Sequence, residues 1–151
     1  MARPKLPLEG GCRCGEVRIR ISAPPLLTMA CHCTGCQRMT GGPYSLSVAI
    51  PAEGFEVIQG EPTLGGLRAE LKHFCCPSCL SWMFTKMPGM DWFVNVRAMM
   101  LDDVSWFTPF VETMTSEMLP WAQTPAPHSY PKFPPMEAFG ALTAEFAALP
   151  D

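Results

Sequence analysis

Residues 74–82, Phe74-Cys75-Cys76-Pro77-Ser78-Cys79-Leu80-Ser81-Trp82, contain three of the eight cysteines in this 151-residue chain. Cys76 and Cys79 are separated by two residues, the spacing at which a tight turn directs two sulfurs toward one metal ion. Segments 69–74 and 81–86 lie on either side, and we expect them to pair as a β-hairpin around this turn. The hairpin would form the centre of the fold.

The Cys-x-x-Cys turn supplies only two ligands, whereas structural zinc prefers four, most often thiolate sulfurs. We assign the other two to Cys12 and Cys14, because the surrounding glycines tolerate the positive φ of a turn. These glycines are Gly10, Gly11 and Gly15. One closed zinc site on Cys12, Cys14, Cys76 and Cys79 would join the N-terminal strand to the hairpin, and its binding energy would be folding energy.

A third group, Cys31-His32-Cys33-Thr34-Gly35-Cys36, places three sulfurs within six residues. Gly35 permits the local turn that would gather them. Three protein ligands with an open fourth position are typical of catalytic zinc, which lowers the pKa of a bound thiol or polarises a carbonyl. Alternatives stay open. The three thiols could form a redox centre or bind a metal only loosely. His32 or a residue distant in sequence could also supply a fourth ligand and close the site.

A redox pair at Cys76 and Cys79 would leave the other two cysteine groups unexplained. Cys75, the remaining cysteine, is expected to point away from Cys76 and to serve as a small buried apolar residue. The sequence therefore predicts seven metal ligands and two zinc ions.

Composition excludes several classes of protein. The chain is 48% hydrophobic with a net charge of −3 and a pI of about 5.6, which fits one globular domain over 1–151 and offers no basic footprint for nucleic acid. No apolar run resembles a signal peptide or a membrane helix. We expect a cytoplasmic protein, whose thiols stay reduced.

Short alternating segments predict a mainly β, mainly antiparallel domain with a core over about residues 8–115. These segments are 16–22, 26–30, 44–50, 55–58 and 92–96. Six prolines in 120–135 predict an extended arm, and residues 136–149 predict a short C-terminal helix. Its apolar positions are Met136, Phe139, Leu142 and Phe146. We expect this face to pack on the sheet rather than to form a homodimer contact.

Together the motifs resemble the glutathione-dependent formaldehyde-activating family, which includes the centromere protein V group. They are 10–15 (Gly-Gly-Cys-Arg-Cys-Gly), 31–37 (Cys-His-Cys-Thr-Gly-Cys-Gln) and Phe74 with 76–79, and the resemblance spans about 8–100. It implies a zinc-binding β-tent of stacked antiparallel sheets, with a structural zinc and a second, active-site zinc on the ligands assigned above. The activity implied is the joining of glutathione and formaldehyde into S-hydroxymethylglutathione. An enzyme of this activity is classed as a carbon–sulfur lyase, after the reverse reaction.

This chain departs from the family pattern at two positions. Leu80 stands where the family usually has glycine after the last cysteine, which could reshape the turn. Cys75 intervenes between Phe74 and the first cysteine of the turn. Neither departure removes a ligand.

Glutathione carries two carboxylates, so we expect cationic groups along its groove. The candidates are Arg13, Arg38 and Lys86, each with the alternative of an ordinary solvated charge. His32 could act as a general acid or base, or orient a ligand, or be structural. Four large apolar residues have two alternative roles: they could form the wall of a pocket, or they could belong to the ordinary core. These residues are Trp82, Met83, Met87 and Trp92.

Two other functions compete with a thiol–aldehyde enzyme. One is a non-catalytic zinc module that binds glutathione or a protein partner, which a fourth protein ligand on the second zinc would favour. The other is a thiol redox protein resembling zinc-containing methionine sulfoxide reductases, for which Cys75 would have to be the reactive cysteine.

Overall fold

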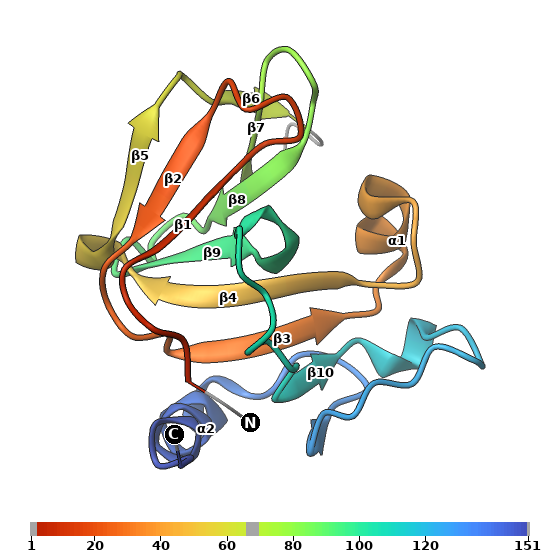
Figure 1. The fold of residues 1–151 in the computed structure, drawn as a ribbon. Coiled ribbons are helices and arrows are strands. Elements are labelled where there is room, and N and C mark those ends of the chain that lie inside the picture. The colour runs from red at the N-terminus through yellow and green to blue at the C-terminus, as the bar shows by residue number, and fades with distance from the viewer. Residues whose placement is uncertain (1–2, 66–69, 151) are drawn as a thin grey trace.

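The computed structural model describes residues 3–65 and 70–150, in which eleven strands form two sheets (Figure 1). The smaller sheet is antiparallel, in the order β1-β2-β5. Its strands are β1 (Leu8–Gly11), β2 (Arg18–Ile21) and β5 (Phe55–Gln59). Val17, Ile19 and Ile21 are completely buried, so the alternating segment 16–22 has one core face as predicted.

The larger sheet has the order β11-β10-β3-β4-β9-β8-β7-β6. Its strands are β3 (Leu27–Cys31), β4 (Ser45–Pro51), β6 (Thr63–Gly65), β7 (Lys72–Cys75), β8 (Trp82–Lys86), β9 (Phe93–Arg97), β10 (Val111–Thr113) and β11 (His128–Ser129). β7 and β8 pair antiparallel around the Cys76–Cys79 turn, which confirms the predicted hairpin; Ala69 lies outside the described residues. The mainly antiparallel prediction is confirmed, although β10 runs parallel to β3 and β11.

The main core lies between the two sheets. It combines residues of β2, such as Ile19, with residues of β8 and β9, such as Phe84 and Val96. Gly10 serves close packing here, because a Cβ at this position would overlap the carbonyl oxygen of Met100 in η2 (Ala98–Met100). The expectation that glycines around Cys12 supply positive φ holds for Gly15 alone, with φ 82°.

The second cysteine group opens a helix, α1 (Thr34–Thr40), where only a turn was expected. Cys33 is the N-cap, and its Sγ accepts a hydrogen bond from the backbone N–H of Cys36 at 3.2 Å. Gly41 ends the helix in the left-handed conformation, with φ 66°. The expected turn at Gly35 is therefore wrong, because Gly35 lies inside the helix.

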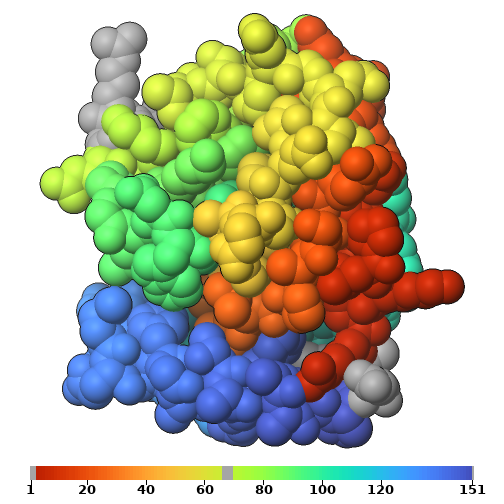
Figure 2. Space-filling model, turned by 90° about the vertical axis from the view of Figure 1, so that its left-hand side faces the viewer, coloured from red at the N-terminus to blue at the C-terminus, as the bar shows by residue number. Residues whose placement is uncertain are grey.

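The C-terminal segment covers one end of the larger sheet. The predicted helix is confirmed as α2 (Met136–Ala147), which packs beside β3 through Phe139, Leu142 and Phe146. Met136 does not join this face and is 64% exposed, because it is the first helical residue and lies at the margin of the packed surface. Figure 2 shows residues 120–150 as a blue band along the lower edge of the molecule.

Two further 3-10 helices, η1 (Ala52–Gly54) and η3 (Thr115–Glu117), connect strands. No helix of the described residues is long and apolar enough to span a bilayer.

Candidate metal centres and the cavity between them

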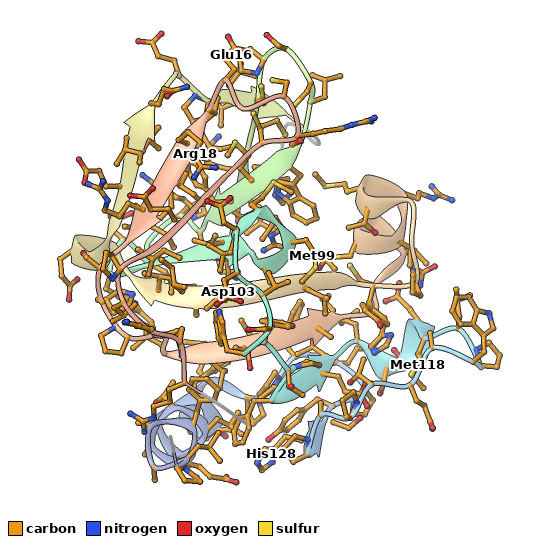
Figure 3. The ribbon with its side chains drawn as sticks, in the orientation of Figure 1. Glu16, Arg18, Met99, Asp103, Met118 and His128 are labelled. Atoms are coloured by element: carbon orange, nitrogen blue, oxygen red, sulfur yellow. The ribbon has the colours of Figure 1, made fainter. Side chains whose placement is uncertain are left out.

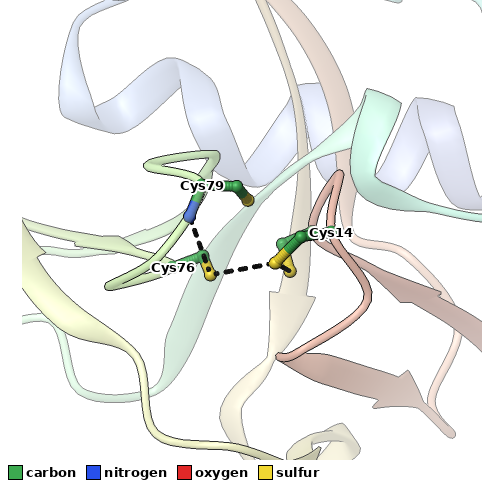
Figure 4. A group of neighbouring side chains, drawn as sticks. Cys14, Cys76 and Cys79 are labelled. Carbon is green, nitrogen blue, oxygen red and sulfur yellow. Dashed lines mark hydrogen bonds between the residues drawn. The ribbon is translucent and has the colours of Figure 1, made fainter.

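The sulfurs of Cys12, Cys14, Cys76 and Cys79, called the bridging group below, all lie within 4.8 Å of one another. The Cys12 and Cys14 sulfurs are 3.5 Å apart, and those of Cys14 and Cys76 are 3.7 Å apart (Figure 4). Tetrahedral zinc with Zn–S bonds of about 2.3 Å requires sulfurs about 3.8 Å apart. The bridging group therefore fits a closed four-sulfur zinc site.

Two tight turns position the bridging group. In the first, the backbone N–H of Val17 donates to Cys12 Sγ at 3.3 Å, which folds the chain back after β1. In the second, the backbone N–H of Cys79 donates to Cys76 Sγ at 3.5 Å, and Leu80 follows with φ 61°. The residue that replaces the family's glycine thus occupies a conformation that favours glycine.

The bridging thiols differ in their affinity for protons. Hydrogen bonding from the Ser81 hydroxyl, 3.2 Å from Cys79 Sγ, lowers the pKa of Cys79 to about 5. At Cys76 the backbone N–H of Cys79 favours the thiolate, but burial and the neighbouring sulfurs outweigh it and raise its pKa to about 12. A divalent cation would offset the repulsion among four thiolates, as zinc does in sites of this donor set.

Cys31, Cys33 and Cys36, called the local group, bring their sulfurs within 4.8 Å of one another at the junction of β3 and α1. All three are half-buried. Within the described parts of the chain, no fourth His, Cys, Asp or Glu joins them. The Ser45 hydroxyl donates to Cys36 Sγ at 3.0 Å, which supports negative charge on that sulfur.

The thiols of the local group also differ in pKa. Hydrogen bonding from the Cys36 thiol lowers the pKa of Cys31 to about 5. The same bond raises the pKa of Cys36, because a thiol that donates to a thiolate resists losing its proton. The three thiols are therefore suited to a cation that would replace their protons.

His32, between two of these cysteines, is completely buried. Its Nε2–H donates to Glu112 Oε2 at 3.0 Å, and Thr124 donates to the same oxygen at 2.8 Å. Burial opposes charge on Glu112, but these hydrogen bonds outweigh it and lower the pKa of Glu112. Gln37 Nε2 donates to the His32 carbonyl at 2.8 Å, so both ring and backbone of His32 are fixed.

This environment favours an orienting or structural role for His32, and a general acid–base role stays a prediction. The sequence reasoning missed Glu112. An acidic residue flanked by Val111 and Thr113 in a short apolar segment was the available signal.

A cavity of about 380 Å³ is lined by chain neighbours of both groups, such as Thr40 of α1 and Ser81 after Cys79, although no cysteine of either group lines it. Its lining comes from the end of α1, residues 44 and 46, residues 80–82, Arg97 and η2. Met99 of η2, labelled in Figure 3, belongs to this lining. Its volume falls within the range of small-ligand sites.

Arg97 was also missed, because the predicted strand stopped at Val96. Its guanidinium carbon lies 4.1 Å from the centre of the Trp82 ring. Burial lowers the pKa of Arg97 to about 10, while negative charge on the Cys36 and Cys31 sulfurs acts in the opposite direction. Arg97 remains a cation at neutral pH.

The predicted cationic candidates lie elsewhere. Arg13, Arg38 and Lys86 are all exposed, and none lines the cavity. Lys86 Nζ lies 5.7 Å from the centre of the Phe74 ring. Their roles as glutathione-binding groups stay predictions.

Trp82 lines the cavity, as one interpretation proposed, whereas Met83 is completely buried in the main core and Trp92 is 59% exposed. Met87 is half-buried and outside the cavity lining. Cys75 is buried beside Gly65, and burial raises its pKa. This fits the predicted apolar role of Cys75.

Residues 7–117 match the sequence profile of the glutathione-dependent formaldehyde-activating enzyme family. A protein of Halomonas elongata that carries this family name is 34% identical over 89 residues, covering 51% of this chain and 55% of the relative. The aligned region thus spans about half the length of that curated relative.

A Rhodobacter sphaeroides protein of known crystal structure superimposes with a TM-score of 0.52 at 21% identity, over 64% of this chain and 90% of that one. This likeness concerns the fold alone.

Proposed function

The chain belongs to the glutathione-dependent formaldehyde-activating enzyme family, and from this premise we propose that it joins glutathione to formaldehyde, or to a related small aldehyde. The product would be S-hydroxymethylglutathione or its homologue. The observation that carries the proposal is the local group, in which three sulfurs converge with no fourth ligand among the described residues, beside a ligand-sized cavity. A closed site would instead favour the non-catalytic alternative.

The reaction is an addition without any change of oxidation state. The carbon–sulfur bond forms between the thiol sulfur and the aldehyde carbon, the carbonyl double bond becomes a single bond, and the thiol proton ends on the oxygen. The reverse reaction breaks the carbon–sulfur bond and places the enzyme among the carbon–sulfur lyases.

The two cysteine groups take different parts in this proposal. Zinc held by Cys31, Cys33 and Cys36 would supply a Lewis acid that favours the thiolate over the thiol. Ser45 supports the charge on Cys36 through its hydrogen bond of 3.0 Å. Glu112 holds the His32 ring, and Gln37 holds the His32 backbone, so the segment between Cys31 and Cys33 keeps one conformation.

Reduced thiols are required at both cysteine groups, so we also propose that the protein works in the cytoplasm. Its partners would be a small thiol and a small aldehyde. A homodimer stays a prediction.

Exchange spectroscopy tests the proposal directly. We would measure, by NMR with 13C-labelled formaldehyde, the rate of exchange between formaldehyde hydrate and the glutathione adduct. The zinc-loaded protein should raise this rate above the spontaneous rate, and Cys33→Ser should return it to that background. Cys75→Ser, which changes a cysteine outside both groups, should retain the acceleration.

Exchange at the spontaneous rate with zinc-loaded protein at every glutathione concentration would contradict the proposal. Loss of the acceleration in Cys75→Ser with zinc retained would instead support the redox alternative.

A further inference from the structure

Arg97 is a buried cation without a carboxylate partner among the described residues. The residue is 9% exposed, and no carboxylate of the described chain forms an ion pair with it. Its Nε is fully buried and has no hydrogen-bond partner in the part of the chain that the structure describes. Burying a charge is costly unless something compensates it, so this position calls for an anion from outside the chain.

The guanidinium is held in a fixed orientation. Its contact at 4.1 Å with the Trp82 ring is a cation–π interaction. The indole N–H of Trp82 donates to Thr85 Oγ1 at 3.1 Å, which leaves the hydroxyl proton of Thr85 for His73 Nδ1 at 2.9 Å. A preorganised planar guanidinium is suited to bidentate binding of a carboxylate.

The surroundings of Arg97 connect it to the local group. Arg97 pairs with Ser47 across β9 and β4, and Ser45 on the same strand donates to Cys36 Sγ. Ser81, which also lines the cavity, contacts Cys79 Sγ at 3.2 Å. Because Arg97 belongs to the cavity lining, a ligand whose body occupies the cavity would lie against Arg97.

Arg97 could have a competing role, which is to balance the charge of the metal group. Three thiolates around a divalent cation leave one net negative charge, and the Cys36 and Cys31 thiolates do act on Arg97. Arg97 could balance that charge alone, in which case its loss would weaken metal binding rather than substrate binding.

We propose that Arg97, held against Trp82, binds a carboxylate of the thiol substrate in the cavity between α1 and the Cys76–Cys79 turn. This inference rests on the proposed function, because it takes glutathione as the thiol. It assigns the substrate anchor to a residue that none of the sequence motifs contains.

Calorimetric titration with glutathione tests the assignment in the zinc-loaded protein. Arg97→Met should weaken binding about tenfold or more, as expected for loss of charge-assisted hydrogen bonds. Methionine fills part of the volume without a charge, so we expect this variant to fold. Arg20→Met is the matched control, because Arg20 pairs with Glu9 on the smaller sheet, away from the cavity, and it should bind as the wild type does.

Two analogues identify which carboxylate is bound. Glutathione ethyl ester lacks the glycine carboxylate, and cysteinylglycine lacks the γ-glutamyl carboxylate. The wild type should bind one analogue about tenfold more weakly than glutathione. Arg97→Met should bind that analogue and glutathione equally, because the interaction is already lost.

Each contrary outcome has a distinct meaning. Wild-type protein that binds none of these thiols would overturn both the inference and the proposed function. Equal binding of glutathione by wild type and Arg97→Met would overturn the role of Arg97 alone. Zinc lost from Arg97→Met, with unchanged affinity for glutathione per remaining zinc, would show that Arg97 serves the metal group instead.

Discussion

The bridging and local groups use the same side chain in opposite structural settings. Cys14 and Cys76 are 62 positions apart in the chain, yet their sulfurs are 3.7 Å apart. The local group lies within six residues and is gathered by one strand end and one helix turn. A metal in the bridging group would close a long loop, and a metal in the local group would close almost none.

Burial distinguishes the two groups only in part, because Cys14 of the bridging group is exposed and Cys79 is half-buried. Cys12 and Cys76 belong to the main core, with exposures of 7% and 0%. The local cysteines are half-buried, and β3 is already paired on both sides, with β4 and β10. We therefore expect the bridging group to serve stability. The local group lies on a frame that other contacts maintain, so we expect it to serve chemistry.

Cys76→Ser should have the largest effect on the protein. Zinc-binding free energies in small structural sites are on the order of 10 kcal/mol, comparable with the whole stability of a domain. We expect this variant to lack a cooperative thermal transition and to carry little zinc. Differential scanning calorimetry and zinc analysis per chain would measure both.

Cys75→Ser is the matched control for that variant, because it changes the neighbouring cysteine of the same hairpin. It should keep its full zinc content and a cooperative transition, with a loss of about 1 kcal/mol for the buried hydroxyl. A Cys76→Ser protein that melts like Cys75→Ser would break the assignment of the bridging group to stability.

Cys33→Ser should abolish activity but leave the fold. We expect about one zinc fewer per chain and a transition lowered by a few degrees, because β3 and α1 keep their own hydrogen bonds. Zinc analysis, calorimetry and the exchange assay on one sample would check this. Equal unfolding of Cys33→Ser and Cys76→Ser would refute the division of labour between the two groups.

Glu112→Gln should cost about 2 kcal/mol at neutral pH, because a hydrogen-bonded ionic partner of buried His32 is lost. The pKa of Glu112 is lowered in the folded protein from its ordinary value of 4.5. Its contribution is therefore complete above about pH 4.5 and is lost as the pH falls through the lowered folded value. Urea unfolding of both proteins between pH 7 and 3 should show the difference shrinking in acid.

Glu145→Gln is the control for that experiment. Glu145 forms an exposed pair with His128 at 3.0 Å, so the change should cost less than about 0.5 kcal/mol at any pH. A Glu112→Gln protein that matches this control would remove Glu112 from the support of the local group.

Leu80→Gly should have the smallest effect, and it should stabilise the protein. Leu80 is 70% exposed with φ 61°, a conformation that costs a non-glycine residue roughly 1 kcal/mol. Relief of this strain should raise Tm by about 2–4 °C. Leu64→Gly, at an exposed leucine without positive φ in β6, should lower Tm instead.

Much of the architecture follows from local pattern. The alternating residues 17–21, the hairpin around Cys76 and Cys79, and the apolar face containing Leu142 all lie where the sequence predicts them. Periodicity reports the local environment of each segment, and the cysteine spacing reports chelation within a turn. The pairing of Cys12 and Cys14 with Cys76 and Cys79 also followed, from counting ligands.

The helix α1 and the parallel pairing of β10 could not be predicted from local sequence pattern. α1 has seven residues and no buried one, so it shows no amphipathic pattern. β10 has three residues, too few to reveal which neighbour it joins. Both depend on contacts with distant segments, such as Thr34 with Glu117 at 3.0 Å.

Spacing and periodicity are properties of neighbouring residues, so they were enough to predict the two cysteine groups that could hold a metal, the mainly β fold and the C-terminal helix. Contacts visible only in the folded chain show that Glu112 holds His32 and that Leu80 adopts a positive φ. They also place Arg97 beside Trp82 in a cavity, with no carboxylate partner among the described residues. The environments of Glu112 and Arg97 arise where segments far apart in the chain meet and exclude water, and the strength of a charge or hydrogen bond there depends on that exclusion.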